Sequence, residues 1–118
     1  MHLDKTTSLP YSCAVFTFIE TKLFTRLLSE HLSDEEYLRL QAALVRDPEA
    51  GAVIPGSGGV RKLRWALPGR GKRGGLRVIY YLRSRQGVIW MLTLYSKSAA
   101  ENIPTAVLRQ IRQEIENG

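Results

Sequence analysis

Hydrophobic and polar positions in the first part of the chain follow a strand pattern and then a helical one. Residues 14–20 (AVFTFIE) alternate and are rich in side chains that favour β-structure, so they predict a strand. A helix over about residues 21–32 follows, because its apolar side chains recur at intervals of three and four positions. These side chains are Phe24, Leu27, Leu28 and Leu32.

A second helix is predicted over residues 34–46. Ser33 and Glu36 have the spacing of a capping box, in which the serine hydroxyl accepts from the Glu36 backbone and the Glu36 carboxylate reaches back. The pair Asp47-Pro48 ends the helix. Its expected inner face consists of Tyr37, Leu40, Leu44 and Val45.

Three apolar runs in the second half predict strands. They cover residues 60–66, 76–84 and 88–95, and they follow a glycine-rich loop at 51–59. Arg85-Gln86-Gly87 predicts a tight hairpin between the last two strands. The third run is apolar at nearly every position, which is typical of a central strand that is covered on both faces.

The chain is expected to end in a helix, and the order of elements then gives the fold class. Pro104 is tolerated in the first turn of this helix, whose apolar positions are Val107, Leu108, Ile111 and Ile115. The predicted order β-α-α-β-β-β-α indicates an α+β fold with helices packed on a mainly antiparallel sheet. We expect residues 14–118 to form one domain and the polar residues 1–13 to be a frayed N-terminal extension.

Positive charge is concentrated in one continuous half of the chain. Residues 50–100 contain ten Lys or Arg residues and no Asp or Glu, whereas the whole chain has a net charge of +6. Repulsion among uncompensated cations destabilises a fold, so this half is expected to bind an anionic partner. A surface that serves only solubility would mix both signs of charge.

Strand alternation assigns these basic residues to faces. Lys62 and Arg64 point to the side of their strand opposite Leu63, and Arg77 shares a face of the next strand with Ile79 and Tyr81. If the two strands pair antiparallel, the three basic side chains line one surface. The alternative is an ordinary solvated strand face. The end of the last strand, at Tyr95 and Lys97, could border the same surface.

The loop before the second of these strands is both basic and flexible. Residues 65–77 (WALPGRGKRGGLR) contain four glycines, and their basic residues are Arg70, Lys72, Arg73 and Arg77. Glycine allows the backbone to approach a phosphate closely and to turn amide groups toward it. A plain hairpin tip is the alternative interpretation.

The residues that are missing limit the chemistry. His2 and His31 are the only histidines, and the basic half has no carboxylate to hold Mg²⁺, so neither a metal nor another cofactor has support in the sequence. Lys, Arg and Tyr can still stabilise the extra negative charge of a pentacoordinate phosphate. RNA brings its own nucleophile, the 2′-OH, so such a cluster could cleave RNA but not DNA by that route.

Two stretches of the basic half, GSGGVRKLRWA and GKRGGLRVIYY, together with SDEEYLRLQAALVRDPEAG and WMLTLYSKSAAENI, resemble bacterial toxins. The chain resembles the RelE/ParE superfamily of type II toxin–antitoxin modules, specifically its HigB-like branch, over about residues 15–116. The resemblance implies a compact fold like that of the microbial RNases. It also implies an endoribonuclease that cuts mRNA in the ribosomal A site and is silenced by a HigA-like helix-turn-helix antitoxin.

Residue roles follow from the same resemblance. Lys62 and Arg64 match the basic pair on the second strand of the domain, and Arg77 matches the arginine that stabilises the transition state. Tyr95 and Lys97 lie where the family has further polar or basic residues. The remaining basic positions are expected to bind rRNA and mRNA backbone: Arg61, Arg70, Lys72 and Arg73. The resemblance leaves the general acid and base unassigned.

Two other functions stay open from the sequence. One is a ParE-like toxin that poisons DNA gyrase, and the other is a non-catalytic nucleic-acid-binding protein.

A single thiol at Cys13 suits a reducing compartment, and no apolar run reaches the roughly 18 residues of a membrane helix. We therefore expect a cytoplasmic protein.

Overall fold

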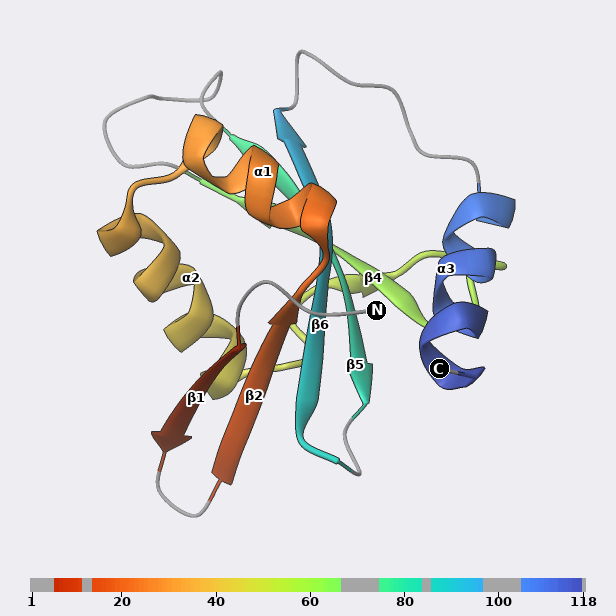
Figure 1. Cartoon of the computed structure of the whole chain (residues 1–118), viewed down its shortest axis with the longest axis horizontal. Coiled ribbons are helices and arrows are strands. Elements are labelled where there is room, and N and C mark those ends of the chain that lie inside the picture. The colour runs from red at the N-terminus through yellow and green to blue at the C-terminus, as the bar shows by residue number, and fades with distance from the viewer. Residues whose placement is uncertain (1–5, 12–13, 67–74, 84–85, 97–104, 118) are drawn as a thin grey trace.

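The computed structural model describes residues 6–11, 14–66, 75–83, 86–96 and 105–117 of the 118-residue chain. These residues form one six-stranded sheet and three helices (Figure 1). The α+β class predicted from the sequence is confirmed. In chain order the elements are β1 (Thr6–Tyr11), β2 (Ala14–Glu20), α1 (Lys22–His31), α2 (Asp34–Arg46), β3 (Ala52–Val53), β4 (Val60–Trp65), β5 (Leu76–Arg83), β6 (Val88–Ser96) and α3 (Thr105–Asn117).

The sheet has the strand order β1-β2-β6-β5-β4-β3. Every neighbouring pair is antiparallel except β2 and β6, which run parallel. The prediction of a mainly antiparallel sheet is therefore confirmed. The apolar strand β6 lies between β2 and β5, and its residues Ile89 and Met91 are fully buried, in agreement with the central position expected from its composition.

Helices cover both faces of this sheet. α1 and α2 pack on one face around Phe24, Leu40 and Tyr80, whereas α3 packs on the opposite face, where Ile79 and Leu108 belong to a second, smaller core. Figure 1 shows α1 and α2 on one side of the strands and α3 on the other. No helix within the described residues is both long and apolar enough to cross a membrane.

Both N-terminal helices begin at side chains that cap them. The Thr21 hydroxyl accepts a hydrogen bond from the Phe24 backbone at 3.0 Å. At α2, the Ser33 hydroxyl accepts from Glu36 N at 3.1 Å and the Glu36 carboxylate accepts from Ser33 N at 2.9 Å. The predicted capping box is thus confirmed, and it satisfies two backbone donors that the first helical turn leaves unpaired.

Two short segments differ from the sequence-based expectation. Residues 6–11, which we expected to belong to a frayed extension, form β1 and pair along β2 from Thr6↔Ile19 to Tyr11↔Ala14. Part of the predicted glycine-rich loop also forms strand β3, where Ala52 and Val53 pair with Lys62 and Arg61 of β4. In both cases pairing with a longer neighbouring strand supplies order that the local sequence pattern does not indicate.

Candidate functional site

The register of β4 and β5 places three basic side chains on one face of the sheet. Arg64 lies directly opposite Arg77. Lys62, two positions before Arg64 on β4, lies opposite Ile79, two positions after Arg77 on β5. Side chains that face each other across antiparallel strands share a face, with Cβ atoms about 4.5–5.5 Å apart. The sequence-based prediction that Lys62, Arg64 and Arg77 line one surface is confirmed.

Tyr95 joins this surface because β6 contains a bulge. The register shifts so that Ile79 pairs with Thr93 while the next residue, Tyr80, pairs with Met91, and Leu92 is the extra residue. Beyond the bulge Tyr95 lies opposite Arg77. Strict alternation from Met91 onward would have turned Tyr95 toward the α1–α2 side, so the bulge determines which face the phenol occupies. We call Lys62, Arg64, Arg77 and Tyr95 the basic face.

The three cations of the basic face lack compensating charge. In the part of the chain that the structure describes, their side chains take part in no hydrogen bond or ion pair. Arg64 is exposed, and Lys62 and Arg77 are partly exposed. Like charges directly opposite each other on a sheet are destabilising, so the Arg64–Arg77 pair costs stability in the free protein. An anion bound between the two guanidinium groups would remove this repulsion.

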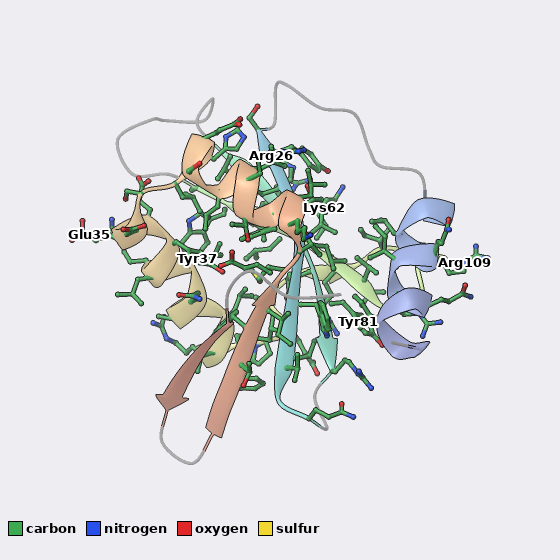
Figure 2. The ribbon with its side chains drawn as sticks, in the orientation of Figure 1. Arg26, Glu35, Tyr37, Lys62, Tyr81 and Arg109 are labelled. Atoms are coloured by element: carbon green, nitrogen blue, oxygen red, sulfur yellow. The ribbon has the colours of Figure 1, made fainter. Side chains whose placement is uncertain are left out.

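The basic face is built on a rigid support. Ile79, the cross-strand partner of Lys62, is only 2% exposed and belongs to the second core. That core also contains Leu108 of α3, and Tyr81 and Tyr95 pack against it. Figure 2 shows Tyr81 between the sheet and α3. Strands that are packed in this way hold side chains more precisely than a loop does.

Arg61 occupies the other side of β4. Its Nη1 atom donates to the Gly51 carbonyl at 2.7 Å and to the Glu49 carbonyl at 3.3 Å. Its cross-strand partner Tyr80 holds the same segment, because its hydroxyl donates to the Pro48 carbonyl at 2.7 Å and accepts from Gly51 N at 2.9 Å. Burial raises the pKa of Tyr80, so the phenol stays protonated. Arg61 thus joins β4 to the segment after α2, on the side of the sheet opposite the basic face.

The remaining predicted site residues lie outside the described residues. They are Arg70, Lys72, Arg73 and Lys97, and the same applies to Pro104 and to Arg85 of the predicted hairpin. Within the described ranges, no three His, Cys, Asp or Glu side chains gather where they could hold a metal ion.

One part of the surroundings was not predicted from the sequence. On α3, Arg109 Nε donates to the Gly56 carbonyl at 3.0 Å (Figure 2), and the Arg112 side chain packs so closely on Gly58 that a Cβ atom there would collide with it. The loop of residues 55–59, which precedes β4, is thereby attached to α3. No local pattern indicates this contact, because the two segments lie about 50 positions apart in the sequence.

The arrangement suits a ribose-phosphate chain better than a small apolar ligand. Its cations lie on two neighbouring strands, with Lys62 and Arg64 about 7 Å apart along β4 and Arg77 opposite Arg64 on β5. A family model described as the RelE toxin of the RelE/RelB toxin–antitoxin system matches residues 16–116. The chain belongs to the RelE toxin family. It is accordingly the toxin component of a toxin–antitoxin module, with an antitoxin as its protein partner.

The match begins at residue 16, inside β2, so β1 precedes the region that defines RelE-family toxins. All of the basic face lies within it. The toxin assignment made from the sequence is therefore confirmed at the level of the family.

Proposed function

We propose that this RelE-family toxin is a ribosome-dependent mRNA endoribonuclease of the HigB-like branch. The observation that carries the proposal is the basic face, where Lys62, Arg64 and Arg77 share one sheet surface and lack ion pairs among the described residues. Cations that gather on one surface without compensating charge lower the stability of the fold unless an anion binds between them.

The proposed reaction is transesterification within the RNA. The 2′-oxygen attacks the adjacent phosphorus and forms a new P–O bond, while the bond to the 5′-oxygen of the next nucleotide breaks. The products are a 2′,3′-cyclic phosphate and a 5′-hydroxyl. The proton lost by the 2′-OH must leave, and the departing 5′-oxygen must gain one.

Each residue of the basic face has a place in this reaction. Arg77 donates to the phosphate oxygens as negative charge develops on them, with Arg64 opposite it. Lys62 binds the same phosphate or moves a proton, and the Tyr95 hydroxyl is the other described group on this face that can exchange one. Arginine stays protonated in proteins, which excludes Arg64 and Arg77 as general bases. In this proposal Lys97 contributes a further cation to RNA binding.

The ribosome fits this proposal because the basic face carries few groups dedicated to proton transfer. Neither a histidine nor a carboxylate lies at any position from 50 to 100. A ribosome that holds mRNA in the A site can orient the 2′-OH for attack, which contributes to the rate through geometry instead of through a strong base. In this proposal Arg70, Lys72 and Arg73 bind rRNA and mRNA backbone, and the toxin works in the cytoplasm with a HigA-like helix-turn-helix antitoxin.

The decisive experiment is to map mRNA 5′ ends after the toxin is induced in bacteria. We expect new 5′-hydroxyl ends inside translated reading frames, and we expect them to vanish when translation initiation is blocked. Arg77→Ala should abolish both the ends and growth arrest, whereas Arg26→Ala, which changes an exposed arginine on α1, should have no effect (Figure 2).

Other results would indicate the competing functions. DNA breaks that depend on gyrase, without mRNA cleavage, would identify a ParE-like toxin. Binding to RNA without growth arrest would identify a non-catalytic module. Undiminished toxicity of Arg77→Ala, with circular dichroism like that of the unmodified protein, would remove this arginine from the site.

A further inference from the structure

Thr21 joins the start of α1 to the bulge in β6. Its backbone N–H donates to the Met91 carbonyl at 3.1 Å, and its hydroxyl donates at 2.7 Å to the carbonyl of Leu92, the extra residue of the bulge. The same hydroxyl oxygen accepts from Phe24 N at 3.0 Å, which makes Thr21 the N-cap of α1. One hydroxyl therefore holds both a helix end and the bulge.

The bulge gives the Leu92 carbonyl an unusual direction. Successive carbonyls of a regular strand point to opposite sides of that strand, yet the carbonyls of Met91 and Leu92 both accept from Thr21. Pairing with β2 ends at Glu20↔Met91, so the Leu92 carbonyl lies just past the last register pair of β2. Leu92 is only 3% exposed, and a buried carbonyl without a donor is costly. The Thr21 hydroxyl supplies that donor.

The position of the bulge decides which way Tyr95 points. With the extra residue at Leu92, Tyr95 pairs with Arg77. If the extra residue moved past Tyr95 toward the end of β6, the register that precedes the bulge would continue, and Tyr95 would pair with Leu76. The side chain of Leu76 lies in the core on the α1–α2 side. Fixing the bulge at Leu92 therefore fixes the phenol on the basic face.

We propose that Thr21 is a positioning residue for the cleavage of RNA. Its hydroxyl holds the Leu92 carbonyl, this contact keeps the bulge in place, and the bulge keeps Tyr95 opposite Arg77. The inference rests on the proposed function, which gives the Tyr95 hydroxyl a part in proton transfer. Thr21 acts through Tyr95 and is assigned no contact of its own with RNA.

Three substitutions separate helix capping from the contact with the bulge. Thr21→Ser keeps both the donor and the acceptor. Thr21→Asp keeps an acceptor for Phe24 N, and aspartate is a preferred N-cap, but an ionised carboxylate cannot donate to the Leu92 carbonyl. Ser33→Ala is the matched control, because it removes the N-cap of the other N-terminal helix, α2.

Cleavage of mRNA on programmed ribosomes is the first readout. For Thr21→Asp we expect kcat to fall on the order of 10-fold with KM unchanged, because a displaced phenol transfers protons less well while the cations still bind RNA. Thr21→Ser and Ser33→Ala should keep the kcat of the unmodified toxin. In a Tyr95→Phe background, Thr21→Asp should cause no further loss. An unchanged kcat of Thr21→Asp, or the same loss in the Tyr95→Phe background, would overturn the proposal.

A second readout does not depend on activity. In NMR spectra of the toxin with isotope-labelled tyrosine, the Tyr95→Phe variant identifies the ring signals of Tyr95. We expect these signals to shift in Thr21→Asp and to stay in place in Thr21→Ser and Ser33→Ala. If Thr21→Asp does not fold, Thr21→Gly replaces it in both readouts, because glycine is tolerated at an N-cap and also lacks the donor.

The two readouts separate the positioning role from the proposed function. Ring signals of Tyr95 that stay in place in the folded Thr21 variant would overturn the positioning role, even in a toxin that cleaves mRNA. Shifted signals in a toxin that cleaves no mRNA would contradict the proposed function and would still show that Thr21 positions Tyr95.

Discussion

The charged side chains on the two faces of the sheet differ in whether they have hydrogen-bond or ion-pair partners. On the face covered by α1 and α2, Glu20 is only 1% exposed, and its carboxylate accepts from the Thr25 hydroxyl at 2.6 Å and from the Tyr37 hydroxyl at 2.8 Å. On the other face, Arg64 and Arg77 face each other without an ion pair among the described residues. The buried charge has partners, and the surface charges do not.

This difference separates a structural charge from a binding one. A carboxylate inside a protein is tolerated only when donors replace the water that it loses, and the two hydroxyls also join β2 to α1 and α2. The basic face keeps its contact with solvent, so its cations need no partner to remain charged. Their mutual repulsion lowers the stability of the free protein, and the binding of a polyanion would relieve it.

The largest effect should come from the basic face and should concern activity. Lys62→Ala is expected to reduce mRNA cleavage on programmed ribosomes about 100-fold or more, because the proposed mechanism then loses one charged group at the reacting phosphate. The melting temperature should stay close to that of the unmodified toxin, since the removed amine has no partner among the described residues. Thermal unfolding and cleavage of the same samples check both parts. A parallel loss of stability would indicate a structural lysine.

The next largest effect should come from the buried side and should concern stability. Glu20→Ala leaves the hydroxyls of Thr25 and Tyr37 without their acceptor and opens a cavity, so we expect the free energy of unfolding to fall by about 2–4 kcal/mol. Urea unfolding measures this change. Glu30→Ala, at an exposed position of α1, is the matched control and should change it by less than about 0.5 kcal/mol. An equally stable Glu20 variant would show that the hydroxyls find other acceptors.

A smaller effect should depend on pH. Burial and the negative charge of Glu20 raise the pKa of Tyr37 above its ordinary value of about 10. The folded state then holds this proton more tightly than the unfolded state does. The contribution of this group to stability is therefore constant at pH values well below 10, and it is lost as the pH rises above 10.

Tyr37→Phe tests this dependence. At pH 7 it should cost about 1 kcal/mol, because Glu20 loses one donor. Above pH 10 the difference between the two proteins should narrow, since phenylalanine cannot ionise. Tyr80 is present in both proteins, so the comparison isolates Tyr37. Urea unfolding at pH 7 and above pH 10 is the measurement, and a difference that does not change with pH would contradict the assignment.

The smallest effect should be a gain in stability. Arg64→Gln removes one of two like charges that lie directly opposite each other, so we expect about 0.5 kcal/mol of stabilisation together with weaker cleavage. Thermal unfolding at low ionic strength should show the gain most clearly, because salt screens the repulsion. A less stable variant would mean that Arg64 has a favourable contact that offsets the repulsion.

Most regular elements could be predicted because their causes are local. The apolar spacing of α1 and α2, the capping box at Ser33 and the strand composition of β4–β6 act within a few residues of one another. The face of Lys62 and Arg64 also followed from alternation alone. Their alignment with Arg77 needed only the assumption of antiparallel pairing, which the register confirms.

Other features could not be predicted, because distant segments decide them. β1 and β3 are ordered by neighbouring strands. The hydrogen bonds of Arg61 to carbonyl groups of the turn after α2 also join segments that no local pattern connects. In the sequence, Glu20 is the polar last residue of a predicted strand. In the structure it is buried, and α1 and α2 each supply a hydroxyl donor to its carboxylate.

The sequence by itself determined the helices, the main strands and the concentration of positive charge, since side-chain periodicity and composition are properties of short segments. Only the tertiary structure decided which charges share a surface. The bulge at Leu92 turns Tyr95 toward Arg77, and the division of helices between the two faces buries Glu20 while it leaves Arg64 exposed. The physical reason is that strand register and packing depend on contacts between residues far apart in the chain.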